Sequence, residues 1–263
     1  RHGVVVRSVD INASRADATL ETCGESTGGL SVRLGIGSVR GLSSAVAREI
    51  ETHRPFANME DLVRKVPQLH IGQLEALATA GAFNESFGQQ RRDALWSAGA
   101  VIQSRPDRLQ GVTTGAASPQ LPGMQPLDEM IADLWATGVA SSGHPTEFLR
   151  AELARMGVAT ATELPSCGAR GDEKVLVAGT VTHRQRPATA QGVTFINLED
   201  ETGLINVVCS QGCWIRYRKA AHGAGALLVR GRLEVGDGGV INVIAEHIAP
   251  LSVGAKVMAR NFR

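Results

Sequence analysis

The clearest pattern in the chain is a pair of β-type runs between residues 192 and 208. In the first run the apolar residues Ile196 and Leu198 lie two positions apart, a period that is typical of a strand with one buried face. The second run, 204–209, is almost wholly apolar. Residues 200–203, which separate the two runs, are mostly polar and end in glycine, as turns commonly do. The pattern therefore predicts a β-hairpin.

Three further β-type runs surround this hairpin, at 174–181, 225–235 and 238–247. A short amphipathic segment at 211–221 separates the third run from the fourth. Strands in the order β-β-β-α-β-β over about 75 residues are typical of an OB-fold, a small barrel that often holds single-stranded nucleic acid. An unrelated small β-sandwich remains the alternative.

Helical periodicity dominates the stretch from 32 to 96. Gly41 lies between two amphipathic segments, and Ser43 or Ser44 can cap the second. Two helices joined by a short Gly-Leu-Ser hairpin form a helix-hairpin-helix, in which hairpin amides and a helix N-terminus contact a DNA phosphate without reading the base. Solvated helix faces remain the alternative for most basic residues of this region. The candidate DNA contacts here are Arg40, Gly41, Leu42 and Ser43.

The remaining segments are expected to be irregular or to connect the two regions. Residues 1–32 are expected to be irregular apart from a short strand at 3–6 and a turn at 8–12. Residues 111–126 are expected to be a linker, because they are rich in Gly, Thr, Ala, Ser and Pro. Two amphipathic helices are predicted at 127–139 and 144–156, in an acidic stretch that suits a connector or a partner surface. Residues 120–124 resemble a degenerate sliding-clamp peptide that lacks the aromatic anchor.

Composition and charge restrict the possible partners. The chain has 263 residues, of which 43% are hydrophobic, so it is long enough for two domains. Its net charge is +1, and any contact with nucleic acid must therefore come from local patches. The four cysteines are scattered without a histidine or second cysteine pair to complete a zinc site, which predicts reduced thiols in a cytoplasmic protein. No signal peptide and no apolar run of about 18 residues is present, so no membrane partner is expected.

The predicted barrel carries the candidate contacts for a single strand. Alternation places Phe195 and Asn197 on the face opposite Ile196, where an aromatic ring can stack on a base for about 1–3 kcal/mol. Packing of Phe195 under a loop is the alternative. The loop between the first two strands is expected at 183–192. Basic side chains in this loop and on the fourth run can pair with phosphates or simply be solvated; they are Arg184, Arg186, Arg230 and Arg232.

His144, which precedes Pro145, is expected to cap or hydrogen-bond a turn rather than to act as a ligand. Candidate carboxylates lie in predicted turns or on predicted helices. They do not form a pair on adjacent strands beside a phosphate-binding loop. We therefore assign no catalytic residue, metal ligand or cofactor to this chain.

Several short segments, taken in order, resemble one family. They are residues 9–14, 34–42, 55–56, 74–83 and 142–145, followed by the barrel. This order is similar to the C-terminal part of bacterial C-family DNA polymerases, the α-subunit-like replicases. Within the barrel, 184–187 and 198–203 resemble most the error-prone, damage-inducible branch. The chain also begins at Arg1 rather than Met, so we expect it to be the C-terminal piece of a larger protein.

The resemblance implies a multi-domain α+β fold, with an all-α tandem helix-hairpin-helix region followed by an all-β OB-fold barrel. The expected domains are the end of the fingers region (1–32), the helix-hairpin-helix region (33–110), a flexible linker (111–126), a helical connector (127–165), the OB-fold (166–252) and a C-terminal tail (253–263).

The resemblance also implies a function. The parent would be a DNA-directed DNA polymerase using Mg²⁺ on palm aspartates. That palm is not recognisable here, so this chain alone is expected to be inactive. The hairpins would hold duplex DNA and the barrel single-stranded template during damage-induced translesion synthesis. In one alternative the barrel is a protein-docking module that recruits the polymerase to other damage-tolerance proteins. The sliding clamp is a further candidate partner, through the segment at 120–124. In another the chain is an anticodon-type RNA binder.

Overall fold

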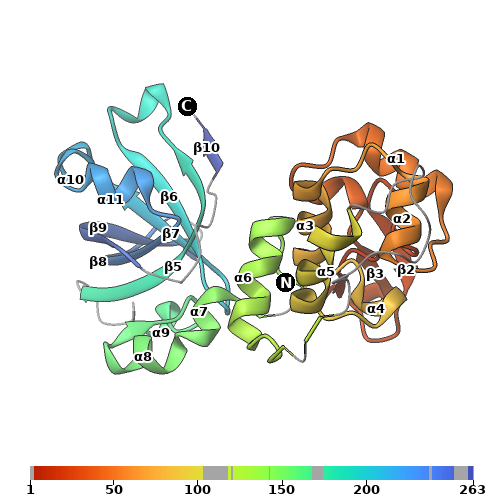
Figure 1. Cartoon of the computed structure of the whole chain (residues 1–263). Helices are drawn as coiled ribbons and strands as arrows, with labels where there is room; N and C mark the ends of the chain where they lie inside the picture. The colour runs from red at the N-terminus through yellow and green to blue at the C-terminus, as the bar shows by residue number, and fades with distance from the viewer. Residues whose placement is uncertain are drawn as a thin grey trace. The chain divides into compact units, whose positions relative to one another are not determined.

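The computed structural model describes residues 3–102, 118–119, 121–141, 143–167, 174–236 and 239–251, together with the backbone of 260–262. The chain divides into two compact units, Arg1–Ser142 and Gly143–Arg263, each drawn in Figure 1. Each unit has its own hydrophobic core.

The first unit begins with a small sheet. Its strands are β1 (Val6–Arg7), β2 (Thr19–Thr22) and β3 (Leu30–Arg33), in the order β1-β3-β2, with the short 3-10 helix η1 (Thr27–Gly29) between β2 and β3. β3 pairs in parallel with β1 and antiparallel with β2. The short strand expected at 3–6 overlaps β1, and the expected turn at 8–12 is present, whereas β2 and β3 were not predicted. The strands are short, and in β3 the polar residues Ser31 and Arg33 are buried while Leu30 is exposed, so the apolar residues do not mark the buried face.

Helices build the rest of this unit. They are η2 (Ile36–Ser38), α1 (Ser44–His53), α2 (Met59–Lys65), α3 (Ile71–Thr79), α4 (Asn84–Phe87), α5 (Arg91–Val101) and α6 (Pro126–Ala136). Their apolar faces meet in a core in which Ile50, Leu74 and Phe83 are fully buried. The segment before Gly41 forms only the three-residue helix η2, and not the amphipathic helix that the pattern predicts.

α6 packs within the first unit. A buried ion pair joins Arg91 of α5 to Asp133 of α6, with Nη2 and Oδ1 2.6 Å apart. The expected connector at 127–165 is therefore divided, because α7 (Pro145–Phe148) and α8 (Arg150–Arg155) belong to the second unit. Most of the predicted linker at 111–126 lies outside the described residues.

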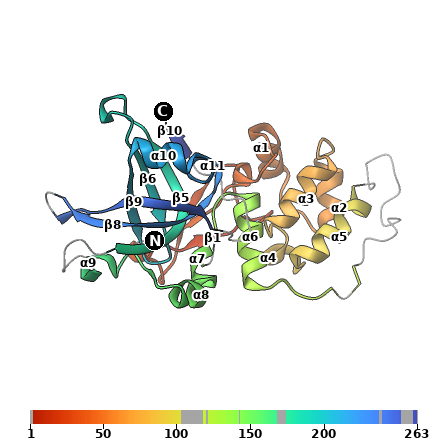
Figure 2. The ribbon, with the colours of Figure 1, turned by 90° about the vertical axis from the view of Figure 1, so that its left-hand side faces the viewer.

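The second unit is a closed barrel of five strands, as predicted. They are β5 (Lys174–Gln185), β6 (Thr194–Glu199), β7 (Leu204–Cys209), β8 (Ala226–Val235) and β9 (Ile241–Pro250), paired in the cycle β5-β6-β7-β9-β8-β5. β7 and β9 are parallel and the other pairs antiparallel, which is the connectivity of an OB-fold. The ladder between β8 and β9 is long (Figure 2). Between β7 and β8 the chain forms α10 (Gln211–Arg216) and α11 (Arg218–Gly223).

Two glycines let barrel strands approach closely. A Cβ at Gly179 of β5 would lie 2.7 Å from the carbonyl oxygen of Glu199, and one at Gly231 of β8 would lie 2.3 Å from that of Ile244. The interior is filled by apolar side chains, among them Ile196 and Leu198, which are fully buried as the alternation predicts.

β5 is long and changes partner along its length. Its first half pairs with β8 and its second half with β6, with a register shift between Val181 and His183. Two short strands, β4 (Val158–Ala159) and β10 (Arg260–Phe262), pair in parallel with its two halves. The remaining short helices are α9 (Leu164–Cys167) and η4 (Ala188–Ala190).

Candidate nucleic-acid interface

The hairpin around Gly41 is an exposed and well-anchored turn. Gly41 has φ +80°, in the left-handed region, and a Cβ there would meet nothing within 4 Å. Ser43 accepts the N–H of Val46 and so caps α1, as the sequence predicts. Gln73 at the start of α3 donates to the Gly41 carbonyl at 3.1 Å. This bond ties the hairpin to a second turn, between α2 and α3.

The hairpin also has backbone N–H groups that the fold does not use. Within the described residues, the backbone N–H groups of Gly41 and Ser43 donate to no other group. Arg40 is exposed beside them, whereas Leu42 is buried and anchors the turn in the core. Of the four candidate residues, the structure therefore presents Arg40, Gly41 and Ser43 to solvent and gives Leu42 a packing role.

Trp135 of α6 lies next to this hairpin and was missed by the sequence analysis. The guanidinium carbon of Arg40 lies 5.2 Å from the centroid of the indole ring, and Trp135 is 49% exposed. The backbone N–H of Arg40 also donates to the carbonyl of Ala136, at 2.7 Å. α6 is far from the hairpin in the sequence, so no local pattern indicates that the two segments are in contact.

Phe195 and Asn197 lie on the outer face of the barrel, as predicted. Phe195 is 38% exposed and Asn197 is half-buried. Strand register extends this face over neighbouring strands, because directly paired residues point to the same side of a sheet. Phe195 is paired with Val208, and Val208 with Ile244. We call these three residues the apolar row.

A second row runs beside the first. Asn197 is paired with Asn206, and Asn206 with Asn242, so three half-buried asparagines lie side by side on β6, β7 and β9. We call them the amide row. The sequence analysis found only Asn197. Alternation identifies the outward residues of each strand, but only the register of the closed barrel brings Asn206 and Asn242 into line with it.

Arg184 does not lie in an exposed loop, and this expectation was wrong. β5 extends to Gln185, and Arg184 is paired with the inward-facing Ile196, so it is only 5% exposed. Its Nε donates to the carbonyl of Ala221 at 2.6 Å and its Nη2 to that of Ala224, at the end of α11. Burial lowers the pKa of the guanidinium, which stays charged because its ordinary pKa is so high.

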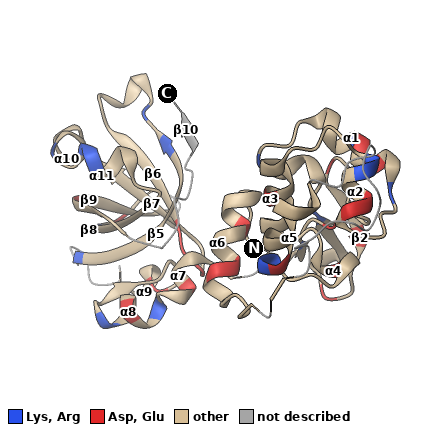
Figure 3. Ribbon diagram, in the orientation of Figure 1, with Lys and Arg blue, Asp and Glu red and all other residues tan. Residues whose placement is uncertain are grey.

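The other three candidate arginines are exposed. Arg186 lies in the loop after β5, and Arg230 lies on β8. Arg232 shares Glu246 with Lys174, at 3.6 and 3.2 Å respectively, so its charge is partly balanced. From 203 to 233 the sequence holds five basic and no acidic residues. Three of them lie exposed on or beside α11, where Figure 3 shows blue segments: Arg216, Arg218 and Lys219.

His144 has the structural role that the sequence predicts. It is buried, caps α7, and its Nδ1 lies 2.6 Å from the hydroxyl of Thr146. The same hydroxyl donates a hydrogen bond to the carboxylate of Glu201, which also accepts one from Arg150. Burial opposes ionisation of Glu201, but these hydrogen bonds outweigh it and lower its pKa to about 2. Asp200 is fully buried and accepts backbone N–H groups of the turn.

The described residues contain no group of three or more His, Cys, Asp or Glu side chains placed to hold a metal ion. All four cysteines are free, and burial raises the pKa of Cys209 and Cys213, which keeps these thiols protonated. No helix in the described part of the chain is long and apolar enough to cross a membrane.

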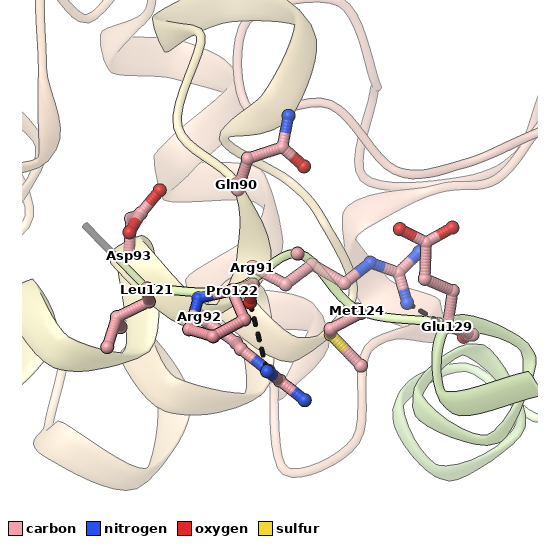
Figure 4. Close-up of a pocket in the computed structure, with 9 residues that line it drawn as sticks. Gln90, Arg91, Arg92, Asp93, Leu121, Pro122, Met124 and Glu129 are labelled. Carbon is pink, nitrogen blue, oxygen red and sulfur yellow. Dashed lines mark hydrogen bonds between the residues drawn. The ribbon is translucent and has the colours of Figure 1, made fainter. Parts of the chain in front are cut away.

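A cavity of about 150 Å³ lies beside the start of α5 (Figure 4). Leu121 and Met124 line it and are half-buried, and Pro122 accepts a hydrogen bond from Arg92 at 2.9 Å. These residues belong to the segment that resembles a clamp peptide, whose Gln120 lies outside the described residues. The described part of that segment packs on the chain's own helix.

Two family models match the chain. The model of the helix-hairpin-helix motif matches residues 3–94, and that of the OB-fold nucleic acid binding domain matches 175–251. A solved asparaginyl-tRNA synthetase from Pyrococcus horikoshii is 20% identical over 36% of this chain and 22% of its own, with a TM-score of 0.30. That score is too low to support an inference.

Relatives with a shared name match the chain along its whole length. Error-prone DNA polymerase of Mycobacterium bovis is 51% identical over 100% of this chain and 24% of its own length. The proteins of the same name from Nocardia farcinica and Corynebacterium efficiens are 49% and 42% identical, over 100% of this chain and 23% and 24% of their own lengths. The chain thus spans about a quarter of the length of these relatives. It corresponds to the C-terminal region of error-prone DNA polymerases, a region that contains a helix-hairpin-helix motif and an OB-fold.

Proposed function

We propose that this chain holds DNA for an error-prone DNA polymerase that acts in damage-induced translesion synthesis. The hairpins contact phosphates of the duplex, and the barrel holds single-stranded template. The observation that carries the duplex role is the Gly41 hairpin. Its exposed turn offers two backbone N–H groups at the N-terminus of α1, with the cation of Arg40 beside them. Such contacts carry no base information and therefore hold duplex of any sequence.

The barrel role is supported by the composition of its outer face. Phe195 supplies an exposed ring, and exposed Arg186 lies in the loop that follows β5. Strand-binding barrels combine such aromatic platforms with basic side chains along the backbone path. Arg230 and Arg232 can extend that path on β8. Arg184 is not part of the proposal, because its guanidinium is occupied inside the barrel.

Nucleotidyl transfer belongs to other parts of the complete polymerase, where carboxylates would hold Mg²⁺. The described residues offer no such cluster. We therefore expect the purified chain to leave a primer unextended in the presence of Mg²⁺ and nucleotides. Template-dependent extension by this chain would contradict the assignment.

The binding test uses the 263-residue chain with labelled single-stranded and duplex oligonucleotides over a range of salt concentrations. Both affinities should fall with salt, because phosphate contacts release counterions. The exposed side chains of Leu204 and Ile215, at 62% and 66%, favour a second function, docking of the barrel on other damage-tolerance proteins. Absence of salt-dependent single-strand binding would favour docking.

A further inference from the structure

The amide row differs from the other candidate contacts in its chemistry. Its three side chains come from adjacent strands and lie in direct register on the outer face of the barrel. The structure gives none of these side-chain amides a hydrogen-bond partner within the described part of the chain. The row therefore has donors and acceptors that the fold does not use.

A phosphate and a base make different demands on such a row. Phosphate oxygens only accept hydrogen bonds, so arginine, lysine and backbone N–H groups suit them best. A base edge presents donors and acceptors together, and an asparagine side chain offers both. The same barrel has arginines elsewhere that suit phosphates. The three adjacent asparagines are therefore better suited to contact with base edges.

The apolar row lies beside the amide row, at a distance that one base can span. Residues two positions apart on one strand are separated by about 6.8 Å, which is close to the width of a base. Phe195 lies two residues from Asn197, and Val208 lies two residues from Asn206. A base stacked on Phe195 can therefore direct its edge toward the amide row.

We propose that the amide row hydrogen-bonds to base edges, so that the barrel binds some bases in preference to others. This inference rests on the proposed single-strand function and adds selectivity to it. The ligand is a single-stranded segment with unpaired bases. A strand-binding barrel that works by stacking and phosphate contacts alone shows only modest sequence preference.

The test compares oligo-dA, oligo-dC and oligo-dT of about 12 nucleotides, a length within the site size of one barrel, for binding to the full chain. We expect their Kd values to differ by about 5- to 150-fold, since one bidentate amide–base pair supplies that much discrimination. The triple variant Asn197→Ala/Asn206→Ala/Asn242→Ala should bring the three values within about threefold of one another. The matched control Arg186→Ala should weaken all three by one common factor, because it removes a phosphate contact.

Equal Kd values for the three oligonucleotides with the unaltered chain would overturn the inference while leaving the proposed function intact. A preference that survives the triple substitution would come from stacking and would overturn it as well. Failure of the unaltered chain to bind any single strand would remove the proposed function and this inference with it. The three asparagines are only half-buried and have no side-chain hydrogen bond within the described residues, so we expect the triple variant to fold, and its melting temperature checks this. The single variants Asn206→Ala and Asn242→Ala should each already narrow the spread of the three Kd values, which keeps the test decisive if the triple variant does not fold.

Discussion

Single residues of the barrel take their roles from the side of the strand on which they lie. Arg184 is paired with Ile196, and both face the interior. Phe195, one position away from Ile196, faces outward. Two residues that look equally suited to nucleic acid in the sequence therefore differ, because one stabilises the fold and the other is available for binding.

Replacing Phe195 by alanine tests the outward role. We expect Phe195→Ala to weaken single-strand binding by about 1–3 kcal/mol, the range for loss of one base–aromatic stack. The melting temperature should change little, since the ring is 38% exposed. Leu20→Ala in the first unit, where the side chain is 66% exposed, removes apolar surface elsewhere and should leave binding unchanged. Fluorescence anisotropy titrations measure both. Equal affinity of Phe195→Ala and the unaltered chain would contradict the stacking role.

Alanine substitutions at Arg184 and Arg186 should have different effects, the first on stability and the second on binding. Arg184→Ala leaves the carbonyls of Ala221 and Ala224 without their buried donor, and should lower the free energy of unfolding of the second unit by about 1–3 kcal/mol. Arg186→Ala should leave stability unchanged and reduce the slope of log affinity against log salt by about 0.7. Urea denaturation and salt titrations distinguish the two effects. A stable Arg184→Ala variant with a reduced slope would restore Arg184 as a phosphate contact.

At the scale of elements, the Gly41 hairpin and the turn after β6 each depend on a few fixed hydrogen bonds. The hairpin is held by the cap of Ser43 and by Gln73, and its left-handed residue is open to solvent. The turn after β6 is held by the buried carboxylate of Asp200 and by Glu201. The first arrangement exposes backbone donors, whereas the second satisfies them internally.

Gly41→Val should weaken duplex binding by a similar factor on unrelated sequences, because the added side chain opposes positive φ and blocks the approach of a phosphate. Gly28→Val is a matched control. Gly28 has the same φ of +80° and equally open surroundings, so it carries the same backbone cost away from the hairpin. Gel-shift titrations with two unrelated duplexes measure the effect, and circular dichroism should show unchanged helix content. Equal losses in both variants would indicate a general effect of strain.

Glu201 should make the second unit sensitive to acid. Its pKa falls from 4.5 to about 2 on folding, so the ionised form is favoured in the folded chain. The stabilisation is fully present above pH 4.5 and is lost as pH falls toward about 2. Glu201→Gln should reduce stability at neutral pH by about 1–3 kcal/mol and flatten its dependence on pH in this window. Urea denaturation at several pH values measures this. An unchanged pH dependence in Glu201→Gln would assign the acid sensitivity to other groups.

At the scale of the whole molecule, the sequence predicts what local periodicity encodes. The barrel was predictable because Ile196 and Leu198 alternate with outward residues and the strands follow in a known order. Contacts between segments that are distant in the sequence were not predictable. The Arg91–Asp133 ion pair, the position of Trp135 beside Arg40 and the alignment of Asn206 with Asn242 all depend on tertiary packing or barrel register. β5 also continues past its predicted end, which moved Arg184 from a loop into the interior.

The close approach of strands at Gly179 and Gly231, together with the side chains that fill the interior, leaves the barrel without a lumen. A strand bound by the proposed rows therefore lies across an open face and passes through no ring. The strand can bind and dissociate from the side at any internal position, and no free end has to pass through the barrel. A template that is continuous on both sides of a lesion needs this kind of access.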